Sequence, residues 1–488
     1  MAYLRLTFAR KLSALATRVP QGPGKPLFIG GFVLLGGLTC GLVTVYQGPW
    51  LGFLILAELV YCATVLARPL VGVLGTIGLL YLLPFGVNPV PLGSFHLTFL
   101  DISLSVTLWA WVLRVLSRQE RTLVLSPVGA PLLLFLGLAV VALLFGVTLI
   151  SAERLRLFFK MVNSILFFFT IINVLRSRQE VEAAARAVVL GAGAAGALAL
   201  ALYLLPASAS LRMLTSLGWL GYPSGDGVLR YIADTSVLRA VGTAVDPNLL
   251  GGMLMIALPL LAGQLVDRRP ILPRVLLGAL LLTAAAALLL SYSRSAWLGA
   301  LVGLFTLGVF RYRKLLLYGG LALVLLMVVP QGGAFVERFW SGVIFADRAA
   351  QMRLGEYNDA LNLVAQYPAF GVGFGEAPKL DLYVAASSIY LLAAEQMGLI
   401  GLAGFIFVLG VFFWTAFRRR DVAEARGLGG IQIGALAGVL GAASAGLFDH
   451  YFFNLQFPHT VALFWLFVGL ATAATRDADQ GAASKAAA

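Results

Sequence analysis

The feature that most limits how this chain can fold is a series of continuous apolar segments, most of them about 20 residues long. A helix needs about 20 apolar residues to cross a bilayer core, whereas a strand of a transmembrane barrel has about ten residues of alternating polarity. The segments therefore predict an all-α, polytopic transmembrane helical bundle of about 12–14 spans. They lie at approximately 27–46, 49–67, 69–86, 99–117, 128–150, 158–175, 182–204, 249–266, 274–292, 295–310, 315–330, 389–417, 427–447 and 456–475.

The composition of the chain is that of a membrane protein. Of its 488 residues, 60% are hydrophobic and 12% are charged, against about 45–50% and about 25% in soluble domains. The length fits one large bundle rather than several soluble domains. The two cysteines, Cys40 and Cys62, lie in apolar segments and indicate neither a disulfide nor a metal site. The sequence contains no phosphate-binding glycine loop of the P-loop type and no HExxH zinc motif.

The basic residues of the loops predict how the bundle is oriented. Cytoplasmic loops carry an excess of Lys and Arg, and every second loop here is basic when counted from a cytoplasmic N-terminus. The basic loops contain Arg68 or cover 114–121, 176–180, 267–274, 311–314 and 418–426. We therefore expect both termini in the cytoplasm. The net charge of +13 indicates contacts with the membrane rather than with nucleic acid.

Three parts of the chain can be distinguished. Residues 1–26 are basic and amphipathic, and we expect a cytoplasmic segment on the membrane surface rather than a cleaved signal peptide. Residues 27–475 form the predicted transmembrane domain, with large outer loops at about 205–248 and 331–388. Helical periodicity interrupted by Gly and Pro predicts that both loops are partly helical extracytoplasmic caps. Residues 476–488 are small and polar, which predicts a disordered cytoplasmic tail.

Several cations lie on the predicted outer side, where basic residues are not expected. They are Arg154, Arg156, Lys160, Arg230, Arg239, Arg294, Arg338, Arg348, Arg353 and Lys379. A cation at membrane depth costs about 2.5–3.5 kcal/mol on insertion scales, so such residues face a partner or a cavity. They either pair with acids and lipid headgroups, or several of them converge on a phosphorylated lipid, whose oxygens match the guanidinium fork. Arg294 favours convergence, because its neighbours offer no acid within one helical turn.

Four segments of the second half of the chain occur in an order that is typical of one family. They are "RAVGTAVDPNLLGGMLMIALPL" (239–260), "SYSRSAWLGALVGL" (291–304), "RLGEYNDALNLVAQYPAFGVGFG" (353–375) and "IYLLAAEQMGLIGLAG" (389–404). Over about 239–475 the chain resembles the O-antigen ligase and O-antigen polymerase superfamily of bacterial membrane glycosyltransferases.

The resemblance implies a multi-pass enzyme of the bacterial inner membrane whose active site is extracytoplasmic. Such enzymes take a glycan from a polyprenyl-pyrophosphate carrier, undecaprenyl pyrophosphate, and transfer it to a lipid, glycan or protein acceptor. The implied partners are the carrier-linked glycan, the acceptor glycan or lipid, and membrane lipids. Reactions of this kind belong to polysaccharide biosynthesis in the cell envelope, including lipopolysaccharide. The resemblance implies no cofactor and no metal.

Four cations stand at basic positions of the family. By resemblance, Arg239 and Arg294 hold the carrier pyrophosphate and stabilise it as the leaving group. Arg353 matches a frequent family arginine ahead of the "P–GVG" turn. Lys160 matches more loosely a basic position after the fifth span. The implied donor site lies beneath the outer loop at 331–388.

The span after this outer loop departs from the family pattern. Family members open it with His-Asn-x-Tyr-Leu, and that histidine is the proposed base for the acceptor hydroxyl. Here Ser387 stands at the histidine position, whereas Tyr390, a substrate-binding candidate, and Glu395 fit the pattern. A serine without an adjacent base takes no proton near neutral pH. Ser387 either caps the helix, with Glu395 bonded inside the bundle, or marks the acceptor side of the site.

The histidines are few, and one of them is a candidate for a relocated base. His96 lies in an outer loop and is interpreted as a loop or interface residue. His450 follows Asp449 in the turn between the last two spans. Its imidazole is either an interfacial anchor among aromatic residues or an oriented base. The catalytic candidates are therefore His450, Glu395 and Ser387.

Two other functions stay open. A catalytically inactive, glycolipid-binding relative would keep the arginines and lack the base. A membrane transporter of the inorganic-carbon-uptake-like branch of the superfamily would need ionisable residues and broken helices near the bilayer midplane. The ionisable residues here gather at the outer ends of the spans, which favours chemistry on a lipid carrier.

Overall fold

The computed structural model is almost entirely helical. It describes residues 49–85, 87, 97–117, 123–148, 150–225, 227–232, 235–328, 332–343, 348–375 and 386–476. Within these residues there are seventeen α-helices, one short 3-10 helix and one two-stranded sheet. The predicted all-α class is confirmed. The first apolar segment, His96, the N-terminal segment and the tail from residue 477 onward lie outside the described residues.

The first half of the chain contributes seven helices. They are α3 (Pro49–Ala67), α4 (Pro69–Leu82), α5 (Phe99–Leu116), α6 (Gly129–Phe145), α7 (Ala152–Val174), α8 (Arg178–Leu204) and α9 (Ala207–Thr215). The 3-10 helix η1 (Ser216–Leu220) follows, and then the antiparallel strands β1 (Arg230–Tyr231) and β2 (Leu238–Arg239).

The second half contributes ten helices to the described part of the chain. They are α10 (Pro247–Val266), α11 (Arg274–Leu290), α12 (Arg294–Phe310), α13 (Lys314–Val328), α14 (Gly332–Val343), α15 (Arg348–Gln366), α16 (Ile389–Arg418), α17 (Arg420–Ala425), α18 (Gly429–Ala445) and α19 (Pro458–Ala474).

These helices follow the apolar segments of the sequence closely. For example, the segment at 49–67 is helix α3, and the segment at 295–310 is helix α12. Five described helices are long and apolar enough to cross a membrane, namely α5, α7, α8, α10 and α16, and seven further apolar helices are shorter. The polytopic fold is therefore confirmed, and the number of spans stays a prediction.

Local sequence signals set where several helices begin. The side chain of Asp246 accepts hydrogen bonds from the backbone of Asn248 and Leu249, directly before Pro247 opens α10. At the start of α8, Ser177 and Glu180 form a reciprocal capping box. Such caps satisfy backbone donors that the first helical turn leaves without partners.

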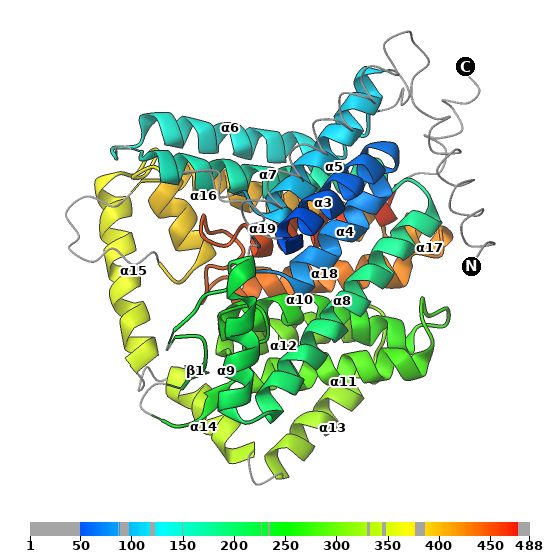
Figure 1. The fold of residues 1–488 in the computed structure, drawn as a ribbon, viewed down its shortest axis with the longest axis vertical. Helices are drawn as coiled ribbons and strands as arrows, with labels where there is room; N and C mark the ends of the chain where they lie inside the picture. The colour runs from blue at the N-terminus through cyan, green and yellow to red at the C-terminus, as the bar shows by residue number, and fades with distance from the viewer. Residues whose placement is uncertain are drawn as a thin grey trace.

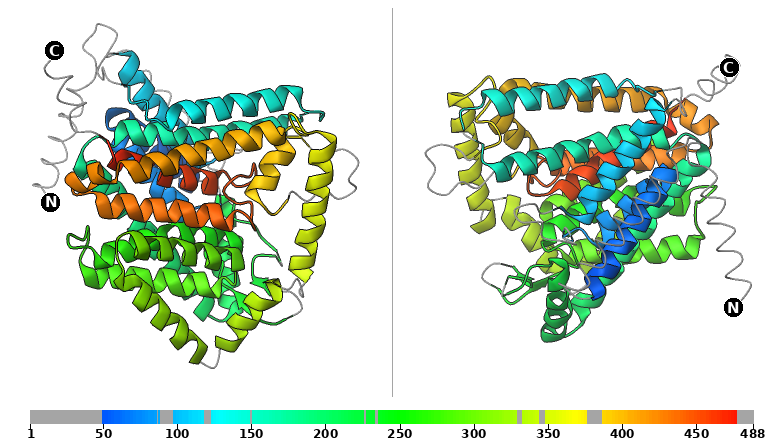
Figure 2. Two further views of the ribbon diagram at one scale, coloured as in Figure 1. Left: turned by 180° about the vertical axis from the view of Figure 1, so that it is seen from behind. Right: turned by 45° about the horizontal axis from the view of Figure 1, so that its top comes forward.

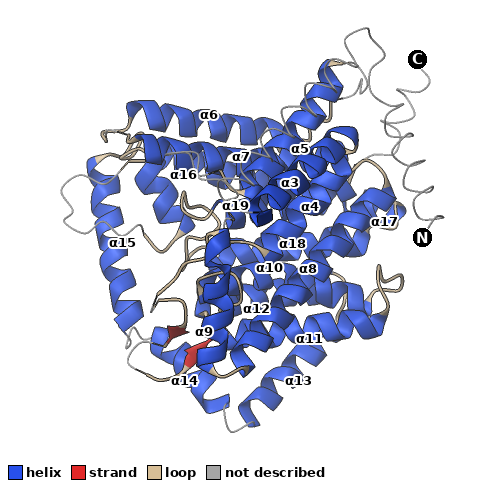
Figure 3. Ribbon diagram, in the orientation of Figure 1, coloured by secondary structure: helices blue, strands red, loops and turns tan. Residues whose placement is uncertain are grey.

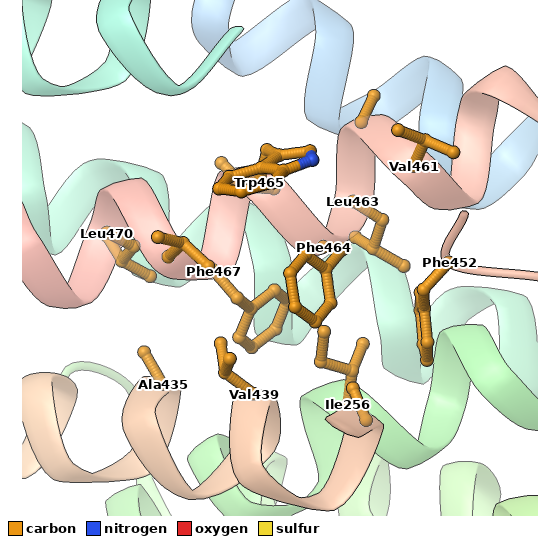
Figure 4. Close-up of a cluster of buried hydrophobic side chains, with 14 of the residues drawn as sticks. Ile256, Ala435, Val439, Phe452, Val461, Leu463, Phe464, Trp465, Phe467 and Leu470 are labelled. Carbon is orange, nitrogen blue, oxygen red and sulfur yellow. The ribbon is translucent and has the colours of Figure 1, made fainter. Parts of the chain in front are cut away.

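The centre of the bundle is formed by α10, α18 and α19. Figure 4 shows the side chains that meet there, including Ile256 of α10, Val439 of α18 and Phe464 of α19, all buried. The helices approach closely where small residues face each other. A Cβ atom on Gly441 of α18 would overlap the carbonyl oxygen of Gly299 in α12. Glycine at such positions lets helix backbones pack closely in a membrane protein.

The bundle has two distinct ends. Helix α15 lies across one end and α17 lies at the other, with α6, α7 and α16 running between them (Figures 1 and 2). The two predicted outer loops contain α9 and η1 in the first and α14 and α15 in the second, as their helical periodicity predicted. The short sheet β1–β2, drawn in red in Figure 3, was not predicted. We refer to these ends as the α15 end and the α17 end.

Candidate functional site

Arg239 and Arg294 are brought together by the turn between α11 and α12. Arg239 lies on β2, and its Nε donates to the carbonyl oxygen of Ser291 at 2.8 Å. Its Nη2 donates to the Asn248 amide oxygen at 2.8 Å. Ser291 is three residues before Arg294, which opens α12. The bond from Arg239 to Ser291 joins residues that are 52 positions apart in the chain, and it holds Arg239 beside the start of α12.

Arg294 and Arg353 line the same cavity at the α15 end, which we call the arginine cavity. The cavity has a volume of about 260 Å³ and lies between α12, α14, α15 and the turn before α19. Its lining residues are Arg294, Ser295, Leu298, Phe339, Gly342, Ala350, Arg353, Tyr357 and Phe448. Two guanidinium groups are thus set among apolar and aromatic side chains, in a space that suits an anionic group attached to a lipid.

Asp449 connects the elements around this cavity. Its carboxylate is buried, and Oδ2 accepts a hydrogen bond from the Ser295 hydroxyl at 3.1 Å. The same oxygen lies 3.4 Å from Nη2 of Arg353, and Oδ1 accepts from the backbone N–H of His450 at 3.0 Å. The Asp449 carboxylate therefore links α12, α15 and the turn before α19 to one another.

The arginines influence one another electrostatically. Burial lowers the pKa of Arg239 to about 10, which the negative charges of Asp246 and Asp449 partly oppose. The positive charges of Arg338 and Arg294 lower the same pKa further. Burial disfavours a charged group, and like charges add to that cost. An incoming anion would relieve this repulsion.

Arg338 is a member of this cluster that the sequence did not single out as a site residue. It lies on α14, and its carbonyl oxygen is 3.5 Å from Nη1 of Arg294. Its charge acts on Arg239 across the cluster. Because Arg338 lies 44 residues after Arg294 in the chain, only the fold could reveal this proximity.

Two residues with strained backbone conformations lie near Arg239 and Arg294 in the chain. Among the described residues, the non-glycine positions with positive φ are Val245, at 68°, and Tyr292, at 52°. Val245 precedes the cap of α10, and Tyr292 lies between Ser291 and Arg294. A left-handed conformation costs a β-branched or aromatic residue of order 1–3 kcal/mol, and such strain is concentrated at functional sites.

Helix α16 is broken where the sequence predicted one continuous span. Gly398 has φ 68° and ψ −176°, which separates residues 389–397 from the rest of the helix. The "GVG" turn (371–373) binds the backbone at this break. Val372 N–H donates to the Glu395 carbonyl at 2.8 Å, and Gly373 N–H donates to the Gln396 carbonyl at 3.1 Å. The family turn thereby fixes the first half of α16.

Ser387 lies immediately before α16 and contacts α15. Its backbone N–H donates to the Glu356 carboxylate at 3.1 Å, and its carbonyl accepts from the Tyr357 hydroxyl at 3.1 Å. The helix cap is Ser388, whose side chain accepts from Leu391 N–H. The alternative that Ser387 caps this helix was therefore wrong by one residue, and its own side chain is not used for capping.

His450 is oriented by the residue that precedes Ser387. Its Nδ1 lies 3.1 Å from the carbonyl oxygen of Ala386, and its ring stacks on Phe457 with centroids 5.9 Å apart. A carbonyl oxygen only accepts, so Nδ1 carries the proton and Nε2 keeps a lone pair in the neutral ring. The backbone of Ala386 also hydrogen-bonds the buried carboxyl group of Glu395.

Two candidates lie away from the arginine cavity. The Tyr390 hydroxyl donates to the Ala443 carbonyl of α18 at 2.8 Å, so it serves contact between two helices. Lys160 lies 2.6 Å from Asp101, which links α7 to α5. Both residues of this ion pair line a separate cavity of about 490 Å³ between these helices. The structure therefore does not bring Lys160 to the other basic candidates.

The fold and the cavity define a polytopic helical membrane protein with an arginine-lined site at one end. Residues 279–406 match the family model of O-antigen ligase, and this match supports membership in the O-antigen ligase superfamily of glycan-transferring membrane enzymes. The predicted resemblance is confirmed for residues 279–406. The matched region contains Arg294, Arg353 and Glu395, whereas Arg239 and His450 lie outside it. No curated protein matches the chain.

Proposed function

We propose that this protein transfers a glycan from a polyprenyl-pyrophosphate carrier to a hydroxyl group of a lipid, glycan or protein acceptor. The reaction takes place at the α15 end, which the distribution of basic loops assigns to the outer face of the bacterial inner membrane. The observation that carries the proposal is the single cavity shared by Arg294 and Arg353, with Leu298, Phe339 and Phe448 as apolar walls.

The arginines act on the donor. The pyrophosphate binds between Arg294 and Arg353, with Arg239 behind them, and the prenyl chain leaves along the apolar wall. As the bond between the anomeric carbon and the pyrophosphate oxygen breaks, the electron pair stays on the leaving group. Fixed guanidinium groups stabilise this developing charge without reorganisation. Helix α12 begins at the same place, and its N-terminal dipole adds to the positive potential.

His450 acts on the acceptor. The acceptor oxygen attacks the anomeric carbon while its proton moves to Nε2 of His450, and Ala386 holds the other ring nitrogen. His450 follows Asp449, the carboxylate that holds Arg353, so donor and acceptor groups adjoin. Glu395 supports this arrangement through the Ala386 backbone. Ser387 follows Ala386, the residue that His450 contacts, and takes no proton itself.

Neither alternative is favoured by a specific contact. A transporter would use the break in α16 to present backbone carbonyls to an ion, but the carbonyls of Glu395 and Gln396 accept hydrogen bonds from Val372 and Gly373. An inactive relative would bind carrier-linked glycan without releasing polyprenyl pyrophosphate, so measuring that release separates it from an enzyme.

The test uses purified protein and carrier-linked glycan. We expect release of polyprenyl pyrophosphate by the unaltered protein and a fall of at least about 100-fold in Arg294→Ala, the scale seen when one transition-state donor is removed. Arg294→Lys should retain part of the rate, because it keeps the charge and loses the bidentate fork. Arg212→Ala, an exposed arginine on α9, is the matched control. Unaltered release by a folded Arg294→Ala protein would contradict the proposal.

A further inference from the structure

Helix α14 meets the rest of the bundle along one face. Figure 1 shows this helix at the edge of the molecule, next to α13. Phe335, Arg338 and Gly342 are partly buried, whereas the described side chains between them are exposed. These three positions are spaced at i, i+3 and i+7, which places them on one side of a helix. We call them the inner face of α14.

Phe335 anchors the beginning of α14 on the turn between α11 and α12. Its ring stacks on Tyr292, with centroids 5.3 Å apart and an angle of 15° between the rings. It also meets Trp297 edge to face, with centroids 5.6 Å apart. Trp297 is itself held, because its Nε1 donates to the carbonyl oxygen of Leu288 at 3.0 Å. Aromatic pairs of this geometry are attractive beyond the area that they bury. Helix α14 is therefore fixed on residues that lie on either side of Arg294 in the chain.

The side chain of Arg294 extends along the inner face of α14. Its Nη1 lies 3.5 Å from the carbonyl oxygen of Arg338, and the guanidinium group lies against Gly342, one turn further along the helix. A Cβ atom at position 342 would be 2.7 Å from Cζ and 2.8 Å from Cδ of Arg294, and it would also overlap Nη1. Arg294 therefore occupies the space that any side chain at position 342 would fill.

The backbone of α14 does not itself require a glycine at position 342. Gly342 lies within the helix and is not among the described glycines with a positive φ. In a helical conformation alanine is more stable than glycine, because glycine loses more backbone entropy on folding. The three atoms nearest to a Cβ at this position all belong to Arg294. The contact with Arg294 is therefore the feature that excludes a side chain here.

This contact lies at the wall of the arginine cavity. Arg294, Phe339 and Gly342 line the cavity together. A methyl group at position 342 would meet the far end of a long, flexible side chain, so it would displace the guanidinium group of Arg294 rather than the helix. A misplacement of about 1 Å can lower a rate by about 100-fold when the group acts on the transition state. The orientation of Arg294 is thus sensitive to a residue 48 positions later in the chain.

We propose that Gly342 is a positioning residue for Arg294. The absence of a side chain at position 342 leaves the space in which the guanidinium group of Arg294 lies at the arginine cavity. Phe335 and the carbonyl oxygen of Arg338 hold this part of α14 against the start of α12. The inference rests on the proposed function, in which Arg294 stabilises the pyrophosphate leaving group, and it adds a residue that acts only through Arg294.

The test is a double-mutant cycle on the full chain, with polyprenyl pyrophosphate release from carrier-linked glycan as the measured rate. We expect Gly342→Ala to lower turnover at least about tenfold, while its midpoint of thermal unfolding is no lower than that of the unaltered protein. In an Arg294→Ala background the same change should lower turnover no further, because the residue through which Gly342 acts has been removed. The matched control is Gly333→Ala in the same helix, which has no atom within 4 Å of its Cβ position and should keep full turnover.

Arg294→Lys provides a second background for the same comparison. Its ammonium group lacks the Cζ and Nη atoms that a Cβ at position 342 would overlap, so Gly342→Ala should cost this variant much less than it costs the unaltered protein. An equal fold loss in all three backgrounds, or full turnover by Gly342→Ala, would overturn the positioning role. Full release by Arg294→Ala would contradict the proposed function itself, whereas a loss in Arg294→Ala without a loss in Gly342→Ala would contradict only this inference.

Discussion

The guanidinium group of Arg353 lies 3.4 Å from the carboxylate of Asp449, although the two residues are 96 positions apart in the chain. This ion pair joins α15 to the turn before α19, next to the arginine cavity that Arg353 lines. Both side chains are mostly shielded, with 22% and 8% of their surfaces exposed. The pair therefore connects the stability of helix α15 to the geometry of the proposed donor site.

Replacing Asp449 by Asn tests this connection. The amide keeps an acceptor for the His450 N–H and removes the charge opposite Arg353. We expect a loss of stability of about 1–3 kcal/mol, because a shielded charged hydrogen bond is broken, and a lower rate of transfer. Thermal unfolding and polyprenyl pyrophosphate release are the measurements. The control is Asp359→Asn, on the exposed face of α15, which should change neither the stability nor the rate of transfer. Equal losses in both variants would contradict the proposed role of Asp449.

Two glycines of the "GVG" turn are predicted to be irreplaceable. Gly371 has φ 68°, and a Cβ there would overlap the Glu395 carbonyl oxygen, while Gly373 has φ 84°. Gly371→Ala should destabilise the protein by more than about 1 kcal/mol, since both the conformation and the space exclude a side chain. The control is Gly355→Ala, which lies in α15 with open space around its Cβ position. That variant should be as stable as the unaltered protein or more so, as thermal unfolding can show.

The sequence predicted the helices better than it predicted the site. Continuous apolar runs define spans directly, and α3 begins and ends where its run does. The break at Gly398 could not be found in this way, because apolar residues continue on both sides of it and the cause is a turn 25 residues earlier. Arg338 was missed for a similar reason. Its position beside Arg294 depends on how α14 folds back over α12, which no local pattern records.

Lys160 illustrates a case in which the sequence left two interpretations open. Its ion pair with Asp101 at 2.6 Å predicts a structural role between α5 and α7. Lys160→Gln should destabilise the protein by leaving a buried carboxylate, and adding Asp101→Asn should recover part of the loss. Donor affinity should be unchanged in the double variant, measured with labelled polyprenyl pyrophosphate. A loss of donor affinity there without a loss of stability would instead support the role in donor binding.

The lowered pKa of Arg239 predicts a dependence on alkaline pH. The guanidinium is charged below a pKa of about 10, and only the charged form attracts pyrophosphate. Donor binding should therefore weaken as the pH rises through about 10. Because Asp449 raises this pKa, Asp449→Asn should move the weakening to lower pH. Titrating donor affinity between pH 8 and pH 11 measures both effects, and an identical alkaline loss in Arg239→Gln would show that another group is responsible.

The position of His450 leads to a prediction that a purely structural residue would not share. His450 Nδ1 contacts the carbonyl of Ala386, so the imidazole lies against the residue next to Ser387, where the family places its histidine. If Nε2 takes the acceptor proton, His450→Gln should reduce turnover about 100-fold or more and leave donor affinity unaltered.

Returning a histidine to the family position provides the decisive comparison. In His450→Gln combined with Ser387→His, the new imidazole starts one residue after Ala386, whose carbonyl His450 contacts. The backbone of residue 387 keeps its hydrogen bonds to Glu356 and Tyr357 of α15. We expect the double variant to regain a substantial part of the lost turnover, with donor affinity unaltered. An aromatic anchor at His450 predicts the opposite, because a histidine at 387 cannot replace the stacking on Phe457. Ser387→Asn in the same background is the control, since it adds a polar side chain at 387 that cannot act as a base.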